Sequence, residues 1–271
     1  MYTKLLKHEL RATGRLLGLL TAAALSLGVG GGLVLRLLIV LISQEGENPL
    51  RTMISSGLVI SLVFMGIALV VYASVTQLYL YWRFYKHKFT DQGYLTFTLP
   101  VSCGEIWMSA YVSMLIWTVI SVLVVSISFG AIALIGAGEF LLAEEVRGWI
   151  ELFAESLLQA YQEVGSIALP VTVAVLSLLA SPAIIMSCIT LGAVWAKKHK
   201  VLAAFGIYYG VSTVLSVLQS ILTVILGLTE LSDPVMYLNL ALLLPAVLTA
   251  TLAVVGSLLS IWLTKNKLNL P

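Results

Sequence analysis

The chain has 271 residues, of which 60% are hydrophobic and only 10% are charged, and its mean hydropathy is +1.04. A soluble domain carries roughly 25% charged residues because its surface has to be hydrated, so this composition excludes a water-soluble globular protein. The formal net charge of +2 is too small to indicate a nucleic-acid partner. Two cysteines in separate segments, Cys103 and Cys188, indicate no disulfide framework.

The first fifteen residues, 1–15, combine leucines at helical spacing with basic side chains. Leu5, Leu6 and Leu10 lie near one another on a helix, which leaves the basic residues free to reach lipid headgroups. This pattern predicts a short helix on the membrane surface. The alternative is a basic flank that merely orients the first span. The basic residues of the predicted surface helix are Lys4, Lys7, Arg11 and Arg15.

Six apolar stretches follow, and each is long enough to cross a bilayer, which takes about 20 helical residues. Their hydrophobicity is continuous rather than alternating, which favours helices over the strands of a membrane barrel. The first stretch is also far longer than the apolar core of a secretory signal. We therefore predict an all-α polytopic membrane protein that forms one transmembrane domain over 1–271. The predicted spans are 16–42, 55–80, 106–135, 167–196, 201–228 and 235–263.

Charge between the spans predicts their orientation. Twelve of the 15 Lys and Arg residues fall at the two chain ends and in the second-to-third and fourth-to-fifth connections. By the positive-inside rule this side faces the cytoplasm, so both chain ends are expected there.

Several residues within the spans are candidates for helix packing or for a transport path. A glycine pair four residues apart permits close helix contact or a local break, each proline favours a kink, and each glutamine can bond across helices. An arginine near the outer end of the first span can snorkel to the interface, the alternative being contact with an anionic substrate. These candidates are Gly28, Gly32, Arg36, Gln77, Pro182, Gln219 and Pro245.

The connection between the second and third spans, 81–105, is much longer than a helical hairpin needs. A basic first half is followed by apolar side chains that need something to bury them. They pack either against helix ends of the same chain or against a cytoplasmic partner, and the residues leave both interpretations open. The apolar set is Tyr94, Leu95, Phe97 and Leu99, placed between Gly93 and Pro100.

The outer connection between the third and fourth spans, 138–165, carries apolar residues at steps of three and four, with glutamates on the remaining faces. This pattern predicts an amphipathic acidic helix, which is too charged to span the membrane. We expect it to lie over the outer mouth of the helix bundle.

The chemistry that the chain lacks narrows its function. It has no G-x-x-x-x-G-K-[ST] phosphate loop, and no histidine or acidic residue lies deep within a span. An intramembrane metalloprotease or serine hydrolase is therefore not expected. We assign no catalytic residue and no metal ligand, and we do not expect the chain to be an enzyme by itself.

A basic N-terminal helix (KLLKHELRATGR), six spans and a long second-to-third cytoplasmic loop resemble the permease subunit of an ATP-binding-cassette (ABC) transporter of the type-2 exporter family. The segment RFYKHKFTDQGYLTFTLPVSCGEIW is the most specific part. It is similar to a group of such permeases from Gram-positive bacteria, in which a GYL-x-FTLPV-like stretch precedes the third span.

The resemblance implies that 1–15 is an elbow helix and that 81–105 is the coupling loop, which docks on a separate ATPase subunit. ATP and Mg²⁺ would be bound by that partner, and no cofactor by this chain. A second permease, identical or homologous, would complete the assembly in the lipids of a bacterial cell membrane. The implied docking residues are Asp91, Gln92, Gly93, Tyr94, Leu95, Thr96, Phe97, Leu99, Pro100 and Glu105.

One departure concerns the outer side. Many relatives carry extracellular helices between the fifth and sixth spans, whereas here that connection is short and the amphipathic insert follows the third span. Because no charged pocket is visible in the spans, the expected cargo is an amphipathic peptide, antibiotic or lipid moved outward. The alternatives are a membrane substrate-binding component of an importer and a sensor or immunity protein that transports nothing.

Overall fold

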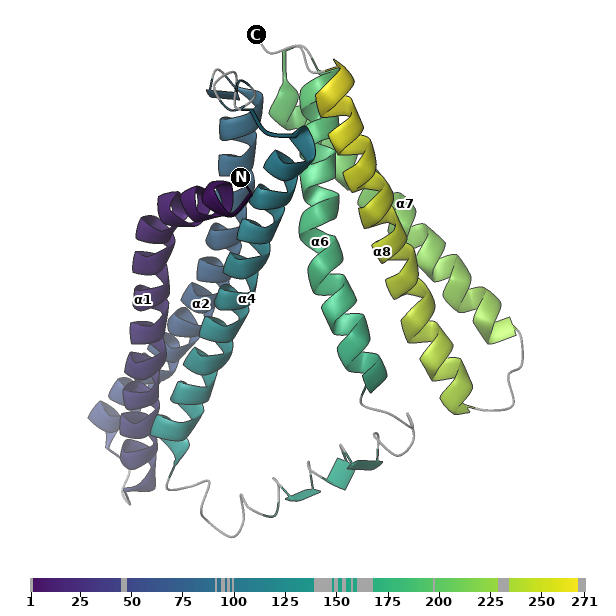
Figure 1. The fold of residues 1–271 in the computed structure, drawn as a ribbon. Helices are drawn as coiled ribbons and strands as arrows, with labels where there is room; N and C mark the ends of the chain where they lie inside the picture. The colour runs from purple at the N-terminus through teal and green to yellow at the C-terminus, as the bar shows by residue number, and fades with distance from the viewer. Residues whose placement is uncertain are drawn as a thin grey trace. The chain divides into compact units, whose positions relative to one another are not determined.

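The computed structural model describes residues 2–44, 48–90, 92–93, 96, 98, 100–138, 148, 151–152, 155–156, 158–159, 168–196, 198–228 and 234–267. These residues form no strand, and six of their helices are long and apolar enough to cross a membrane, which confirms the six spans and the all-helical class. The helices are α1 (Tyr2–Ser43), α2 (Pro49–Phe89), α4 (Cys103–Ala137), α6 (Ala168–Trp195), α7 (Lys200–Leu228) and α8 (Pro234–Lys267) (Figure 1).

Two helices are much longer than predicted. The 42 residues of α1 and the 41 residues of α2 correspond to about 60 Å each, whereas a hydrocarbon core is roughly 30 Å thick. α1 runs without a break through the segment predicted as a separate surface helix, and α2 continues to Phe89, inside the predicted 81–105 connection. No proline interrupts either extension, so neither helix meets a helix-breaking proline there.

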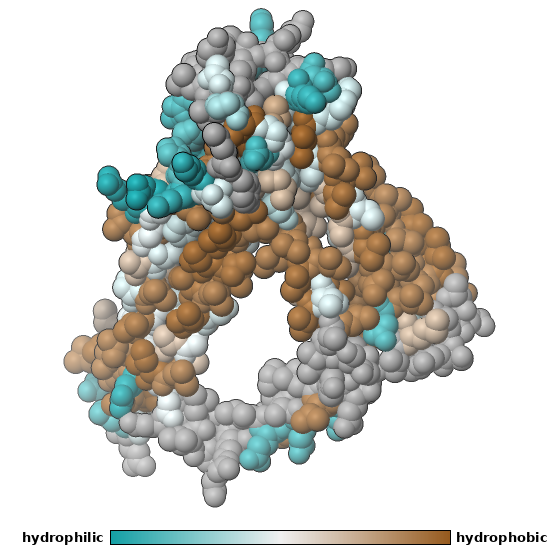
Figure 2. All heavy atoms as spheres, viewed as in Figure 1, coloured by the Kyte–Doolittle hydropathy of each residue, from teal (hydrophilic) through white to brown (hydrophobic). Residues whose placement is uncertain are grey.

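The first turns of α1 differ in character from the rest of that helix, and Figure 2 shows hydrophilic side chains gathered on them. Lys4, Lys7, Arg11 and Arg15 are all exposed there, whereas Leu17 is fully buried. Their contact with lipid headgroups stays a prediction.

The chain divides into two compact units. We call His8–Tyr79 with Ile116–Glu155 the α1 unit, and Met1–Lys7, Leu80–Leu115 and Ser156–Pro271 the α6 unit. α1, α2 and α4 therefore each contribute one part to either unit, whereas α6, α7 and α8 belong to the α6 unit alone.

The α1 unit is built on close contact between α1 and α4. A β-carbon at Gly28 would lie 2.6 Å from Cα of Ser128, and one at Gly32 would lie 2.7 Å from Cβ of Ile135. Only glycine lets the two helices approach so closely. The Gly28–Gly32 pair is thus a packing contact, and α1 continues through it as a helix. The buried cluster of Ala24, Leu69, Tyr72 and Val124 brings in all three helices of this unit.

Polar side chains add bonds between the helices of the α1 unit. Inside hydrocarbon no water competes for such bonds, so they hold the helices in register. Trp117 Nε1 donates to Thr13 Oγ1 at 2.8 Å, Gln77 Nε2 to Thr118 Oγ1 at 3.1 Å, and Ser128 Oγ to the Ala24 carbonyl at 3.1 Å.

In the α6 unit, α6 packs against both α7 and α8, which also touch each other. Two glycines mark the tightest points. A β-carbon at Gly192 would lie 2.5 Å from the backbone nitrogen of Ala204 on α7, and one at Gly256 of α8 would lie 3.0 Å from Ser187 Oγ on α6. α6 thus meets the backbone of α7 at one end and α8 through the Ser187 side chain, which makes it the central one of these three helices.

Candidate functional site

The 81–105 segment begins inside the last turns of α2, where aromatic side chains anchor the helix end in the α6 unit. Phe84 and Phe89 are both buried and meet edge to face with ring centroids 5.7 Å apart, while Tyr85 lies 6.5 Å from Phe89. Pairs of this geometry contribute beyond the area they bury. The end of α2 is therefore part of a packed core.

A compact turn follows the end of α2. The Gly93 N–H donates to the Thr90 carbonyl at 2.7 Å, and Thr96 Oγ1 lies 3.3 Å from the carbonyl oxygens of both His87 and Gln92. Gly93 is buried here, whereas Gln92 is exposed, as is Pro100 further along the segment.

The apolar side chains predicted to dock on a partner, Tyr94, Leu95, Phe97 and Leu99, lie outside the described residues, as does Asp91. Their docking role stays a prediction. The same holds for most of the outer 138–165 segment, of which residues 138, 148, 151–152, 155–156 and 158–159 are described.

The segment ends in a reciprocal cap at the start of α4. The Ser102 N–H donates to Glu105 Oε2 at 3.1 Å, and the Glu105 N–H donates to Ser102 Oγ at 3.2 Å. This is the capping box expected of S-x-x-E before an apolar run, whereas the family resemblance implied a docking role for Glu105. The carboxylate therefore has a local role, because it fixes the point at which α4 begins.

The first turns of α4 connect this cap to α6. Trp107 is buried, and its indole stacks on the ring of Tyr111 with centroids 5.4 Å apart and planes 19° apart. The Tyr111 hydroxyl donates to the carbonyl oxygen of Leu179 at 2.8 Å. Leu179 lies three residues before Pro182, which is fully buried inside α6. The contact of Tyr111 with α6 was not predicted, because nothing local in the sequence indicates which helix this residue meets.

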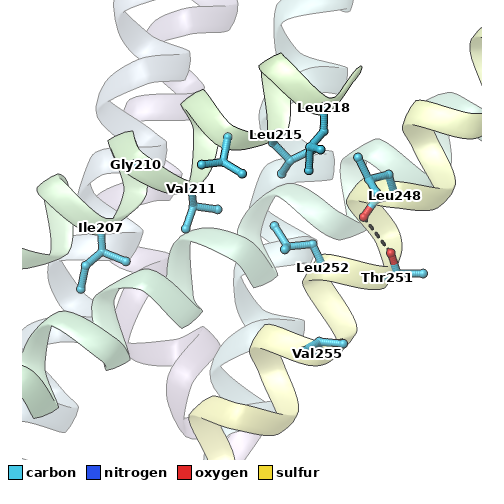
Figure 3. Close-up of a pocket in the computed structure, with 10 residues that line it drawn as sticks. Ile207, Gly210, Val211, Leu215, Leu218, Leu248, Thr251, Leu252 and Val255 are labelled. Carbon is cyan, nitrogen blue, oxygen red and sulfur yellow. Dashed lines mark hydrogen bonds between the residues drawn. The ribbon is translucent and has the colours of Figure 1, made fainter. Parts of the chain in front are cut away.

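An apolar groove of about 520 Å³ lies between α7 and α8 (Figure 3). Its walls are aliphatic apart from Gly210 and Thr251, and the Thr251 hydroxyl donates to the Leu248 carbonyl at 2.8 Å. The groove therefore presents no unsatisfied polar group at this threonine. Residues Ile207, Gly210, Val211, Val214, Leu215 and Leu218 line it from α7, and Leu248, Thr251, Leu252 and Val255 from α8.

The opposite face of α7 is polar. Successive residues of a helix are about 100° apart, which places every serine, threonine and glutamine of α7 within an arc of roughly 120°, on the side away from the groove. Each hydroxyl donates to a carbonyl of its own helix at 2.8–2.9 Å. The residues are Ser212, Thr213, Ser216, Gln219, Ser220 and Thr223, and we call them the polar face of α7.

No protein-family model, curated protein or solved structure matches this chain. We therefore define the candidate site from the structure alone, as the 81–105 segment, the groove between α7 and α8, and the polar face of α7.

The remaining predicted residues are placed as follows. Gln77 bonds across from α2 to α4, Gln219 belongs to the polar face of α7, and Arg36 is exposed on α1. Pro245 lies within α8, where Thr249 Oγ1 donates to the carbonyls of the preceding turn. Among the described residues, no three His, Cys, Asp or Glu side chains come together as metal ligands would.

Proposed function

We propose that this chain is the permease subunit of an ABC transporter. In this proposal it forms the path by which an amphipathic peptide, antibiotic or lipid leaves a bacterial cell, and it couples that path to ATP hydrolysis in a separate ATPase subunit. The observation that carries the proposal is the division of α7 into an aliphatic face and a polar face.

A helix surrounded by lipid gains nothing from a polar face. Five of the six residues on this face are hydroxyl-bearing, and their protons are used within α7, but the oxygen lone pairs remain available to further donors. The amide of Gln219 carries two donors and an acceptor that hydrocarbon does not satisfy. Water in a path through the membrane, or a second permease that lines the same path, would satisfy these groups.

The groove on the other face of α7 favours an apolar or amphipathic cargo. Its volume of about 520 Å³ falls within the roughly 300–1,000 Å³ typical of small-molecule sites. Aliphatic walls fit apolar surface through shape and van der Waals contact and offer no polar group that would require a matching one on the cargo. A charged cargo would find no counter-charge among the residues that line the groove.

The 81–105 segment supports the ATPase partner. It is the part of the chain that resembles the coupling loop of such permeases, and both of its ends are fixed, one by the aromatic core at the end of α2 and one by the cap of α4. A movement imposed on this segment would reach both helices. ATP and Mg²⁺ would be bound by the ATPase, and the positive-inside distribution of charge would place the segment and both chain ends in the cytoplasm.

The mechanism in this proposal is alternating access. Closure of the ATPase pair on nucleotide moves the docked segment, and this movement favours one of two packings of the spans over the other. The exposed basic residues on the first turns of α1 would hold the elbow helix at the headgroups.

Thiol labelling of α7 tests the proposal. In a full-length chain with Cys103 and Cys188 replaced by serine, Ser216→Cys places a thiol on the polar face and Val214→Cys places one at nearly the same depth on the groove face. We expect a charged, water-soluble methanethiosulfonate to label the Ser216→Cys variant much faster in membranes, because only an ionised, hydrated thiol reacts. Equal labelling, or none at either position, would contradict a solvated path along α7.

A further inference from the structure

The central helix of the α6 unit carries Pro182 in its interior and continues through it. Proline has no backbone N–H, so the carbonyl four residues earlier, that of Leu178, loses its helical donor, and the ring pushes that turn open. Such a break is tolerated inside a membrane only where neighbouring groups satisfy the loosened backbone. Pro182 itself is fully buried, so the break lies against other helices of the unit.

One neighbouring group reaches this turn from α4. The Tyr111 hydroxyl donates to the Leu179 carbonyl at 2.8 Å, across 68 positions of sequence. This carbonyl belongs to the turn that Pro182 opens. The bond therefore ties this turn of α6 to α4.

The position of Tyr111 is in turn set by the start of α4. Its ring stacks on Trp107, which is 6% exposed, and Glu105 of the capping box lies six residues before Tyr111 on the same helix. The distance along the helix axis from Glu105 to Tyr111 is about 9 Å. A shift or rotation of the capped end of α4 is thus transmitted to the phenol with little loss.

The part of α6 beyond the proline packs closely against α7 and α8. Ser187 faces Gly256 of α8, and Gly192 meets the backbone of α7 at Ala204. In the same stretch the hydroxyls of Ser187 and Thr190 donate to carbonyls four residues back at 2.7 and 2.9 Å, a bond that favours helix bending. A change of bend at Pro182 must therefore alter the packing of α7 and α8.

We propose that Tyr111 is a positioning residue that links the 81–105 segment to the Pro182 bend of α6. In the permease proposed above, on which this inference rests, a partner that displaces the segment would change the hydrogen bond to Leu179 and with it the packing of α6 against the helices that line the groove.

Tyr111→Phe tests the link, because it removes the hydroxyl and keeps the ring that stacks on Trp107. In the full chain in nanodiscs, without any partner, we expect hydrogen–deuterium exchange of the α6 amides around Pro182 to rise about threefold or more, the factor that corresponds to an interhelical hydrogen bond of about 0.6 kcal/mol. Tyr79→Phe, which removes a hydroxyl from α2 in the α1 unit, should leave that exchange unchanged.

Pro182→Ala is the second variant in this test, because alanine restores the backbone N–H that can donate to the Leu178 carbonyl. In this background Tyr111→Phe should change the exchange of α6 very little, so that the two substitutions are non-additive. Additive effects, or unchanged exchange in Tyr111→Phe alone, would overturn the link. If Pro182→Ala does not accumulate, the comparison of Tyr111→Phe with Tyr79→Phe decides.

A second measurement uses the complex with its ATPase, namely the amount of cargo moved per ATP hydrolysed. A purely structural role of Tyr111 would leave this ratio unchanged. We expect Tyr111→Phe to copurify with the ATPase as the unsubstituted chain does and to lower the cargo moved per ATP hydrolysed by about threefold or more. If Tyr111→Phe alters the hydrogen–deuterium exchange of α6 but leaves the cargo moved per ATP unchanged, the proposed link to transport is overturned. If the unsubstituted chain binds no ATPase, the proposed function fails, and the exchange experiment still tests the Tyr111–Pro182 link.

Discussion

Gly28→Ala is the sharpest test of how the α1 unit is held together. The new β-carbon would lie 2.6 Å from Cα and 2.7 Å from Cβ of Ser128. Neither atom can rotate out of the way, because one is backbone and the other is fixed to it. Ordinary contact begins near 3.4 Å, so α1 and α4 would have to separate locally by roughly 0.8 Å, the difference between the two distances.

The magnitude follows from three contributions. Overpacking of this kind costs about 1–3 kcal/mol. The separation also weakens the 3.1 Å bond from Ser128 Oγ to the Ala24 carbonyl, worth about 0.6 kcal/mol in a membrane. Alanine recovers up to about 1 kcal/mol in helix propensity. The expected net loss is roughly 0.5–2.5 kcal/mol.

Thermal unfolding of the detergent-solubilised chain, followed by tryptophan fluorescence, measures this loss. At about 2–4 °C per kcal/mol, the midpoint for Gly28→Ala should fall by roughly 1–10 °C. Gly18→Ala is the matched control on the same helix, because a β-carbon there meets nothing within 4 Å. A midpoint for Gly28→Ala equal to or above that of Gly18→Ala would refute the close α1–α4 contact.

Two further predictions use the same unfolding assay. Glu105→Ala removes one half of the capping box and should cost about 0.5–2 kcal/mol, whereas Glu105→Gln should recover most of the stability because glutamine also serves in this motif; equal losses would argue against the cap. Gln77→Leu and Thr118→Val should each cost about 0.6 kcal/mol, and the double variant should cost less than their sum because the two side chains share one bond. Additive losses would show that this bond contributes nothing.

Length and continuity of apolar residues made the six spans predictable, since few structures other than a membrane helix accommodate about 20 apolar residues in a row. The ends of α1 and α2 were less predictable. The first turns of α1 are basic and the last turns of α2 are basic and aromatic, which suggested a surface helix and a loop. No proline stands in either stretch, however, and both helices continue through it.

Two features of the candidate site were readable in the sequence but overlooked. Ser102 and Glu105 form the capping pattern before α4, and the serines, threonines and glutamine of α7 recur at the three- and four-residue steps that place them on one face. Both are local patterns, so sequence alone is enough to find them.

The contacts of Tyr111 with Leu179 and of Trp117 with Thr13 belong to a different class. Each joins helices far apart in the chain, and no local pattern states which helices become neighbours. Gln77 was predicted to bond across helices, but its partner Thr118 was not predictable for the same reason.

Copurification tests the central claim most directly, namely that this chain is a permease driven by an ATPase bound at the 81–105 segment. The tagged full-length chain, purified from its native membrane in mild detergent, should bring down an ABC ATPase and stimulate its ATP hydrolysis. The double variant Leu95→Asp with Phe97→Asp should insert into the membrane normally and lose both the ATPase and the stimulation. Unchanged recovery of the ATPase with the double variant would contradict docking at this segment, and absence of any ATPase from the unsubstituted chain would contradict the proposed function itself.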